Sequence, residues 1–146
     1  MKTYRPILEE GLAKRSDGKT LKDFEIQATG TVYLTPDVRT ALDALKPGIA
    51  LYVGGMGAKD KNFHKDKMIA SGYADEANRI QELYLSGRKD EAAAVVPDDF
   101  VEERALVGPP ERIKEKWKAW ADSGMTGITL MHPSEEVVEL MAKIAL

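Results

Sequence analysis

The segment from Glu103 to Met131 constrains the fold more than any other part of the chain. It reads as a short apolar strand at Ala105–Val107, a turn, a helix, and a second apolar strand at Ile128–Met131. Pro109 and Pro110 stand where a helix begins, because its first turn needs no N–H donor. Strand, helix and strand in this order form a βαβ unit, whose strands run parallel and are buried on both faces. The sequence therefore predicts an α/β fold.

The helix of this unit carries one apolar stripe. Ile113, Trp117 and Trp120 recur at three- and four-residue steps, which is the spacing of one helix face. Both tryptophans are expected to pack in the core rather than to form a stacking platform. Gly124 is expected to end the helix.

The N-terminal part predicts a helix at Thr3–Lys14 and then a strand at Lys22–Thr35, where apolar and polar residues alternate. Gly30 within this strand indicates a bulge or the close approach of another group. One face of the strand is small and polar. This face either lines a cavity or meets solvent, and it carries Gln27, Thr29 and Thr31.

The middle of the chain predicts a helix from Val38 that Pro47 and Gly48 break or kink. An apolar run at Ile49–Val53 follows and leads to Gly54–Gly57, with three glycines in four positions. Glycines allow positive φ and the close approach of a ligand. This segment is interpreted as a loop that borders a cofactor or substrate cleft. A flexible connection between two helices fits the spacing equally well, and no phosphate-loop or GxGxxG pattern is present.

Further helices are predicted from apolar spacing and from their end signals. Phe63, Met68 and Ile69 are expected to face inward on the first of them. The predicted helices cover about Lys59–Ser71, Ala74–Ser86, Lys89–Val96, Asp98–Glu103 and Glu135–Ala145.

The run VGPPERIKEKWKAWADSGMTGITL resembles the last βαβ unit of the luciferase-like flavin and coenzyme F-420 (F420) oxidoreductases. In that family a V-G-[ST/P]-P-E-x-[IV] turn enters the penultimate helix, and a G-[VM]-[DT]-x-[IL] run forms the last strand. Leu51–Gly57 and Tyr73–Pro97 resemble the preceding segment in the F420-linked branch. The resemblance extends from about Tyr4 onward. A barrel of this kind needs about 250 residues and eight strands, so the chain looks like its C-terminal portion.

The resemblance implies a partial (β/α)8 TIM-barrel-like unit with about three parallel strands, in a single domain over residues 1–146. A multi-helix insertion is expected at about 54–97. The implied function is part of an oxidoreductase or monooxygenase that transfers a hydride between F420 or a flavin (FMN) and a small organic substrate. The isolated chain is expected to be incomplete and inactive. The alternative is a non-catalytic half-barrel interaction or assembly module.

No catalytic residue of the family can be assigned to this chain. By location only, the residues expected to border the cofactor or substrate are Gly54, Gly55, Met56, Gly57, Asn62, Phe63 and His64. The alternative for His64 is an exposed helical histidine. His132 follows the end of a strand, where barrel enzymes place functional side chains. These two histidines stand in no metal-ligand motif, so no metal site is expected.

Charge and composition argue against several other classes of protein. The net charge is −3 and the basic residues are scattered, which argues against nucleic acid as a partner. The sequence has no apolar run long enough for a membrane span. It contains no cysteine, so the cytoplasm is the expected compartment. Three strands cannot close a barrel. We therefore expect a homo-oligomer, a separate N-terminal half-barrel partner, or a local rearrangement to cover the open strands.

Overall fold

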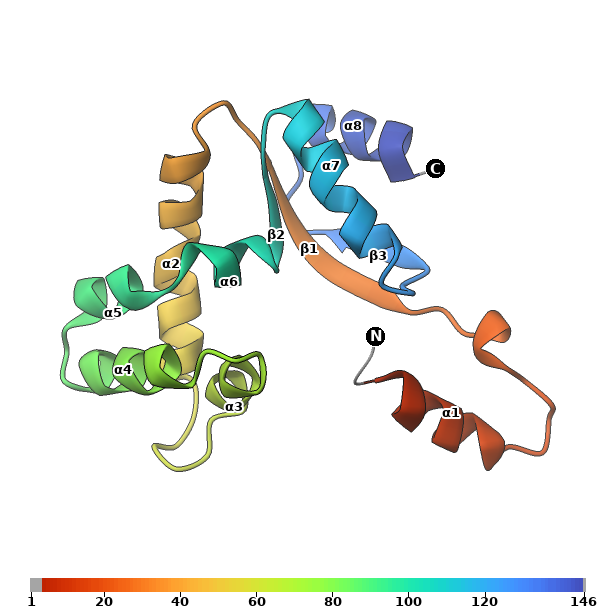
Figure 1. Ribbon diagram of the computed structural model, residues 1–146, viewed down its shortest axis with the longest axis horizontal. Coiled ribbons are helices and arrows are strands. Elements are labelled where there is room, and N and C mark those ends of the chain that lie inside the picture. The colour runs from red at the N-terminus through yellow and green to blue at the C-terminus, as the bar shows by residue number, and fades with distance from the viewer. Residues whose placement is uncertain (1–3, 146) are drawn as a thin grey trace. The chain divides into compact units, whose positions relative to one another are not determined.

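The computed structural model describes residues 4–145 (Figure 1). Thr3, the predicted start of the first helix, lies outside them. The elements, in chain order, are α1 (Arg5–Ala13), a 3-10 turn η1 (Leu21–Asp23), β1 (Gln27–Leu34), α2 (Val38–Gly55), α3 (Phe63–Ala70), α4 (Ala74–Leu85), α5 (Lys89–Val95), α6 (Asp98–Glu102), β2 (Ala105–Gly108), α7 (Pro110–Ala121), β3 (Gly127–Leu130) and α8 (Glu135–Ala145).

The described chain divides into two compact units. One comprises the residues up to Leu34 together with those from Gly108 onward, and the other comprises Thr35–Val107. The helices of the second unit begin at Val38, earlier than the insertion expected at about 54–97. The single domain over residues 1–146 stays a prediction.

The strands form a parallel sheet, as the sequence predicts. Three strands within residues 4–145 are arranged in the order β2-β1-β3. β1 and β3 pair in parallel with an unbroken register from Gln27–Gly127 to Gly30–Leu130. The α/β prediction is therefore confirmed.

Gly30 is required by the packing of a helix on the sheet. A Cβ atom on Gly30 would lie 2.7 Å from a ring carbon of Trp120, which belongs to α7. Of the two interpretations of this glycine, the close approach is confirmed, and the register through Gly30 leaves no bulge. Trp117 is also buried, so both tryptophans are packing residues.

The two faces of the β1–β3 pair differ. The face that contains Gly30 and Val32 is buried, and both α7 and α8 contact β1. On the other face Gln27, Thr29 and Tyr33 are exposed. Since β1 and β3 are in register, Thr129 lies beside Thr29 and is exposed as well. The pair therefore has one covered face and one open polar face.

The strand predicted from Lys22 starts later than expected. Thr20 and Asp23 form a capping box, in which each side chain accepts a hydrogen bond from the other residue's backbone N–H. This box stabilises the 3-10 turn, so the extended strand begins only at Gln27.

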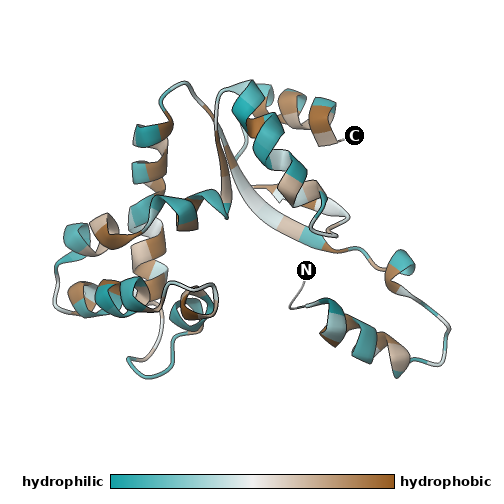
Figure 2. Cartoon of the chain, in the orientation of Figure 1, coloured by the Kyte–Doolittle hydropathy of each residue, from teal (hydrophilic) through white to brown (hydrophobic). Residues whose placement is uncertain are grey.

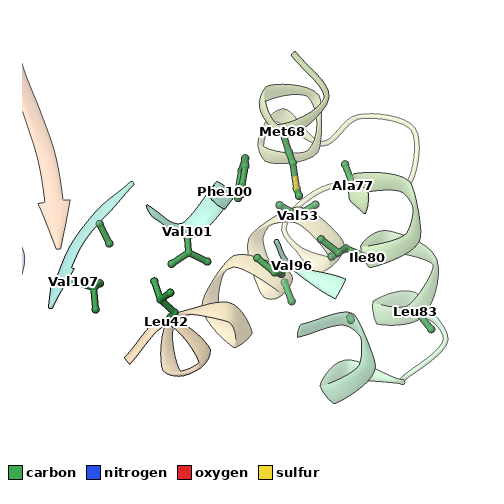
Figure 3. Packing of buried hydrophobic residues seen from close by; sticks show 13 residues of the cluster. Leu42, Val53, Met68, Ala77, Ile80, Leu83, Val96, Phe100, Val101 and Val107 are labelled. Atoms are coloured by element: carbon green, nitrogen blue, oxygen red, sulfur yellow. The ribbon is translucent and has the colours of Figure 1, made fainter. Parts of the chain in front are cut away.

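The helical unit is organised around α2. This helix contacts α3, α4, α5 and α6. Figure 3 shows the buried core between these helices, where Met68 and Ile80 are fully buried. Figure 2 shows that α2 and α4 each carry both apolar and polar residues, as expected for helices with one buried side.

The predicted break at Pro47 was wrong, because α2 continues through it to Gly55. A proline inside a helix costs about 3 kcal/mol by removing a hydrogen bond and crowding the preceding turn. Leu42, Ala50 and Val53 are buried on both sides of this position, whereas Pro47 and Gly48 are exposed. The continuous apolar side of α2 thus offsets the unfavourable proline.

No helix within residues 4–145 is long and apolar enough to cross a membrane.

Lys46 is a buried lysine that forms a charge cluster with two partly exposed aspartates of the helical unit. Its Nζ lies 2.7 Å from Oδ1 of Asp43 and 2.6 Å from Oδ1 of Asp98, while 7% of its side chain is exposed. Burial alone would lower the pKa of Lys46, but the hydrogen bonds and charges of Asp43 and Asp98 outweigh it and raise this pKa. The hydrogen bond from Lys46 lowers the pKa of Asp43. The cluster joins α2 to the start of α6.

These shifts predict a pH window for the cluster. Because the pKa of Asp43 is lowered in the folded protein, its interactions stabilise the fold fully at pH values above the ordinary carboxyl pKa. This stabilisation is lost as the pH falls through the lowered pKa. Because the pKa of Lys46 is raised in the folded protein, its interactions stabilise the fold fully at pH values below the ordinary lysine pKa. This stabilisation is lost as the pH rises through the raised pKa. The cluster should therefore stabilise the fold fully from about pH 4 to about pH 10.

Lys46→Met should lower the free energy of unfolding by about 1–2 kcal/mol at pH 7, because it leaves two carboxylates without their buried partner. The loss should shrink toward pH 3, as the pH falls toward the lowered pKa of Asp43. Urea unfolding followed by circular dichroism at both pH values measures it. Lys118→Met, which removes an exposed ion pair to Glu115, is the control and should cost less than about 0.5 kcal/mol. An equal loss for Lys46→Met at both pH values would contradict the assignment.

Candidate functional site

The predicted site residues lie together at one junction. This junction comprises the last turn of α2, the connecting segment 56–62 and the first turn of α3. Gly54 and Gly55 are the last two residues of α2, so the predicted four-residue glycine loop was wrong at these positions. A Cβ atom on Gly54 would lie 2.4 Å, and one on Gly55 2.5 Å, from atoms of the Tyr84 side chain. Both glycines therefore let α4 pack closely against the end of α2.

Gly57 forms a tight turn. Its φ of +155° is disfavoured for residues with a side chain, and a Cβ atom there would lie 2.8 Å from the carbonyl oxygen of Lys61. The N–H of Lys61 donates a hydrogen bond of 3.0 Å to the carbonyl oxygen of Ala58, which closes the turn. The glycine thus fixes the path from α2 to α3.

Asn62 connects the two helices through its side chain. Nδ2 donates hydrogen bonds to the carbonyl oxygens of Tyr52 (3.1 Å) and Val53 (2.8 Å) near the C-terminal end of α2. Oδ1 accepts hydrogen bonds from the backbone N–H groups of His64 (2.9 Å) and Lys65 (3.0 Å), and so caps α3. With 2% of the residue exposed, its amide donors and acceptor are occupied within the fold.

Other side chains at the junction face outward. Phe63 is 66% exposed, Met56 50% and Tyr52 46%, and His64 is half-buried. The ring centroids of Tyr52 and His64 are 4.8 Å apart, and those of Phe63 and His64 are 5.5 Å apart. The rings therefore form a continuous exposed aromatic cluster centred on His64.

The inward orientation predicted for Phe63 was wrong. The predicted helix started near Lys59, whereas α3 starts at Phe63, directly after its Asn62 cap. On this shorter helix Met68 is the buried residue, and Ile69 is 36% exposed. The shift of the helix start moves Phe63 from the expected core to the surface.

The structure brings all the predicted residues together but divides their roles. Gly54, Gly55, Gly57 and Asn62 shape the backbone and pack or bond within the fold. Met56, Phe63 and His64 present side chains, and Tyr52 joins them. Flat rings and a thioether suit contact with a flat heterocyclic ring such as a deazaflavin or flavin. The junction therefore offers apolar and stacking contacts but no free amide at Asn62.

Tyr52 and Tyr84 were not identified from the sequence as part of this junction. Tyr84 stands at regular helical spacing in α4 and reads as an ordinary core residue. The close packing of Tyr84 depends on Gly54 and Gly55 of α2. Sequence spacing alone does not show that α4 packs against α2.

A second group of polar side chains lies at the carboxyl ends of β1 and β3. Tyr33 is 46% exposed near the end of β1, and His132 is exposed just after β3. His132 has a φ of +46°, an uncommon value for a residue with a side chain. Parallel strands place their carboxyl ends at one edge of the sheet, and barrel enzymes build their sites at that edge.

Among the described residues, no group of three or more histidine, cysteine, aspartate or glutamate side chains could hold a metal ion.

The hydrogen bonds of Asn62 predict a stability effect. Asn62→Ala should lower the free energy of unfolding by roughly 2–3 kcal/mol, because α3 loses its cap and buried carbonyl groups lose their donor. Urea unfolding followed by circular dichroism measures this loss. Asn78→Ala, the same change at an exposed position of α4, is the control and should leave stability unchanged or slightly higher. Equal stabilities of the two variants would contradict the structural role of Asn62.

Comparisons with known proteins place the chain in a family. Residues 1–127 match the family described as luciferase-like monooxygenase. A protein of Mycobacterium tuberculosis (strain ATCC 25618 / H37Rv), named "Putative coenzyme F420-dependent oxidoreductase Rv3520c", is 37% identical over 141 residues, which are 97% of this chain and 41% of that protein. The solved structure of the coenzyme F420 dependent tetrahydromethanopterin reductase from Methanopyrus kandleri matches with a TM-score of 0.68 and 22% identity, over 95% of this chain and 39% of that chain.

The chain thus spans about two-fifths of the length of these two proteins. The structural match confirms the predicted partial barrel-like α/β fold. With most of its length matched by the family pattern, the chain belongs to the luciferase-like monooxygenase family.

Proposed function

We propose that this chain is part of an oxidoreductase that transfers a hydride between coenzyme F420 and a small organic substrate. The observation that carries the proposal is the 37% identity, over nearly the whole chain, to a protein whose name describes F420 dependence. FMN is the alternative cofactor. When bound, either cofactor would supply the hydride chemistry, and the protein would supply binding and orientation.

The junction between α2 and α3 is proposed to border the cofactor. In this proposal Met56, Phe63 and His64 contact the ligand, together with Tyr52. The glycines and Asn62 act indirectly, because they fix the backbone that carries these side chains. The edge at Tyr33 and His132 is proposed to face the substrate, since this is the edge where barrel enzymes bind their ligands.

We also propose that the chain acts with further polypeptide. A closed barrel of this class needs eight strands, and the open face at Thr29 and Thr129 is what an incomplete arc would leave. A homo-oligomer or a separate N-terminal half-barrel would supply the missing cover. The cytoplasm remains the proposed compartment.

A second function is the alternative that the sequence left open. The matched region is 41% of the Mycobacterium tuberculosis relative, so it corresponds to only part of that protein. A non-catalytic half-barrel module that only assembles with other proteins is therefore the alternative.

A titration separates the two functions. The purified chain is titrated with oxidised F420, reduced F420 and FMN, followed by ligand fluorescence. Each titration is repeated in the presence of the part of the Mycobacterium tuberculosis relative that this chain does not match. Saturable binding in the micromolar range is expected for F420 in the presence of that part. Reduced F420 should also be oxidised when a suitable substrate is added.

One result would contradict the oxidoreductase proposal, and a second would contradict only the proposed role of the junction. The first is the absence of saturable binding for every cofactor, with and without the added part, which would favour the assembly module. The second is binding that Met56→Ala and His64→Ala leave unchanged, which would remove the junction from the cofactor site. Met131→Ala, an exposed methionine of the other unit, serves as the matched control.

A further inference from the structure

The middle of α2 contains two consecutive residues that disfavour a helix. Pro47 has no N–H to donate and Gly48 leaves the backbone free, so these residue types are the least favourable in a helix interior. Both are exposed, and a Cβ atom on Gly48 would have no atom within 4 Å beyond its neighbours in the helix. Gly54 and Gly55 are needed for close packing, whereas packing gives no reason for Gly48.

The two halves of α2 are held by different neighbours. In the first half, Nζ of Lys46 lies 2.6 Å from Oδ1 of Asp98 at the start of α6. In the second half, the carbonyl oxygen of Val53 accepts a hydrogen bond of 2.8 Å from Asn62, the cap of α3. The glycines at the end of this half also pack on α4. The polar contacts therefore hold the first half to α6 and the second half to α3.

The helices of this unit group in the same way. α3 packs on α4, α4 packs on α5, and all three pack on α2. α6 also packs on α2, but among the described residues no comparable packing joins α6 to α3, α4 or α5. The chain passes from α5 to α6 through Val96 and Pro97, whose backbone is extended, with ψ values of 118° and 141°. Residues 48–95 are thus joined to the rest of the chain at two points, and a proline stands at each.

From these observations we propose that residues 48–95 move as one body relative to α6 and the first half of α2. The hinges are Pro47–Gly48 and Val96–Pro97, because a hinge needs only a few residues that absorb the change in backbone angles. The apolar contacts between the two parts have no fixed direction and can adjust to the motion. The junction of α2 and α3 belongs to the moving body, so its exposed side chains would move with it. This motion does not depend on the proposed redox function.

Exposed hydrogen bonds hold the moving body in the position that the structure shows. Oη of Tyr73 donates to Oε1 of Glu103 at 3.0 Å, and Nη2 of Arg104 donates to Oγ of Ser71 at 3.3 Å. Ser71 and Tyr73 lie between α3 and α4, whereas Glu103 and Arg104 follow α6. The ring of Tyr73 also meets the ring of Phe100 edge-on, with 5.1 Å between the centroids. Because exposed hydrogen bonds compete with water, this latch can open at a small net cost.

The test measures one distance across the hinges and one within the moving body. The sequence has no cysteine, so spin labels can be attached to cysteines introduced at exposed positions. Ala44→Cys in α2 with Asn78→Cys in α4 spans the first hinge, and Asn78→Cys with Ala94→Cys in α5 lies within the moving body. Pulsed electron paramagnetic resonance should give a broad or divided distance distribution across the hinge and a narrow one within the body.

Variants assign the motion to the hinge and the latch. Pro47→Ala combined with Gly48→Ala should narrow the distribution across the hinge, because α2 then resists bending. Gly11→Ala in α1, where a Cβ atom is equally free of contacts, is the control and should leave the distribution unchanged. Tyr73→Phe removes the latch hydroxyl but keeps the ring, and it should raise the open fraction at least about twofold. Tyr33→Phe is the control for the loss of a hydroxyl, and circular dichroism should show every variant folded.

Three results would overturn the proposal. A single narrow distance across the hinge in the otherwise unaltered chain would show that the body does not move. A broad distribution that Pro47→Ala with Gly48→Ala leaves unchanged would place the flexibility elsewhere. Equal breadth for the two labels within the moving body would show loose packing instead of motion as one body. None of these measurements uses a cofactor, so failure of the redox proposal would leave them unaffected.

Discussion

The β1–β3 pair depends on α7 and α8 for the burial of one face. Trp120 lies so close to Gly30 that no side chain fits between them, and Trp117 adds a buried ring on the same helix. The opposite face presents Thr29 and Thr129 to solvent. Parallel strands usually have cover on both faces, because the helices that connect them pack on both sides of the sheet. A pair with one covered face is therefore the physical basis for the proposal that this chain acts with further polypeptide.

The helical unit differs from the β1–β3 pair, because it has a hydrophobic core of its own. Its central helix is held at one end by the glycines that admit Tyr84 and at the side by Lys46 between two carboxylates. Asn62 then fixes the start of the next helix. These contacts explain why rings at the junction are exposed on an ordered backbone. The same geometry supports the cofactor proposal.

Much of this structure could be predicted from the sequence. The βαβ unit, the strands and most helix limits follow from apolar periodicity and from end signals such as Pro110. Prediction failed where a tertiary contact decided the outcome. Pro47 did not end α2, because buried residues on both sides keep the helix packed. Gly54 and Gly55 were interpreted as part of a ligand-binding loop. Glycine is needed at these positions because the Tyr84 side chain packs against them, and no local sequence pattern reveals that contact. The residues of the candidate site were proposed by location, and their division into scaffold and surface needed coordinates.

The most direct test of the open arc is the reactivity of a single cysteine on each face of β1. The sequence has no cysteine, so Thr29→Cys and Val32→Cys each introduce one thiol. At nanomolar protein concentration, the account predicts that the thiol at position 29 reacts with a maleimide at nearly the rate of a free cysteine, while the thiol at position 32 is protected. Position 29 should become protected when the unmatched part of the Mycobacterium tuberculosis relative is added. Equal protection of both thiols in the chain alone would contradict the account.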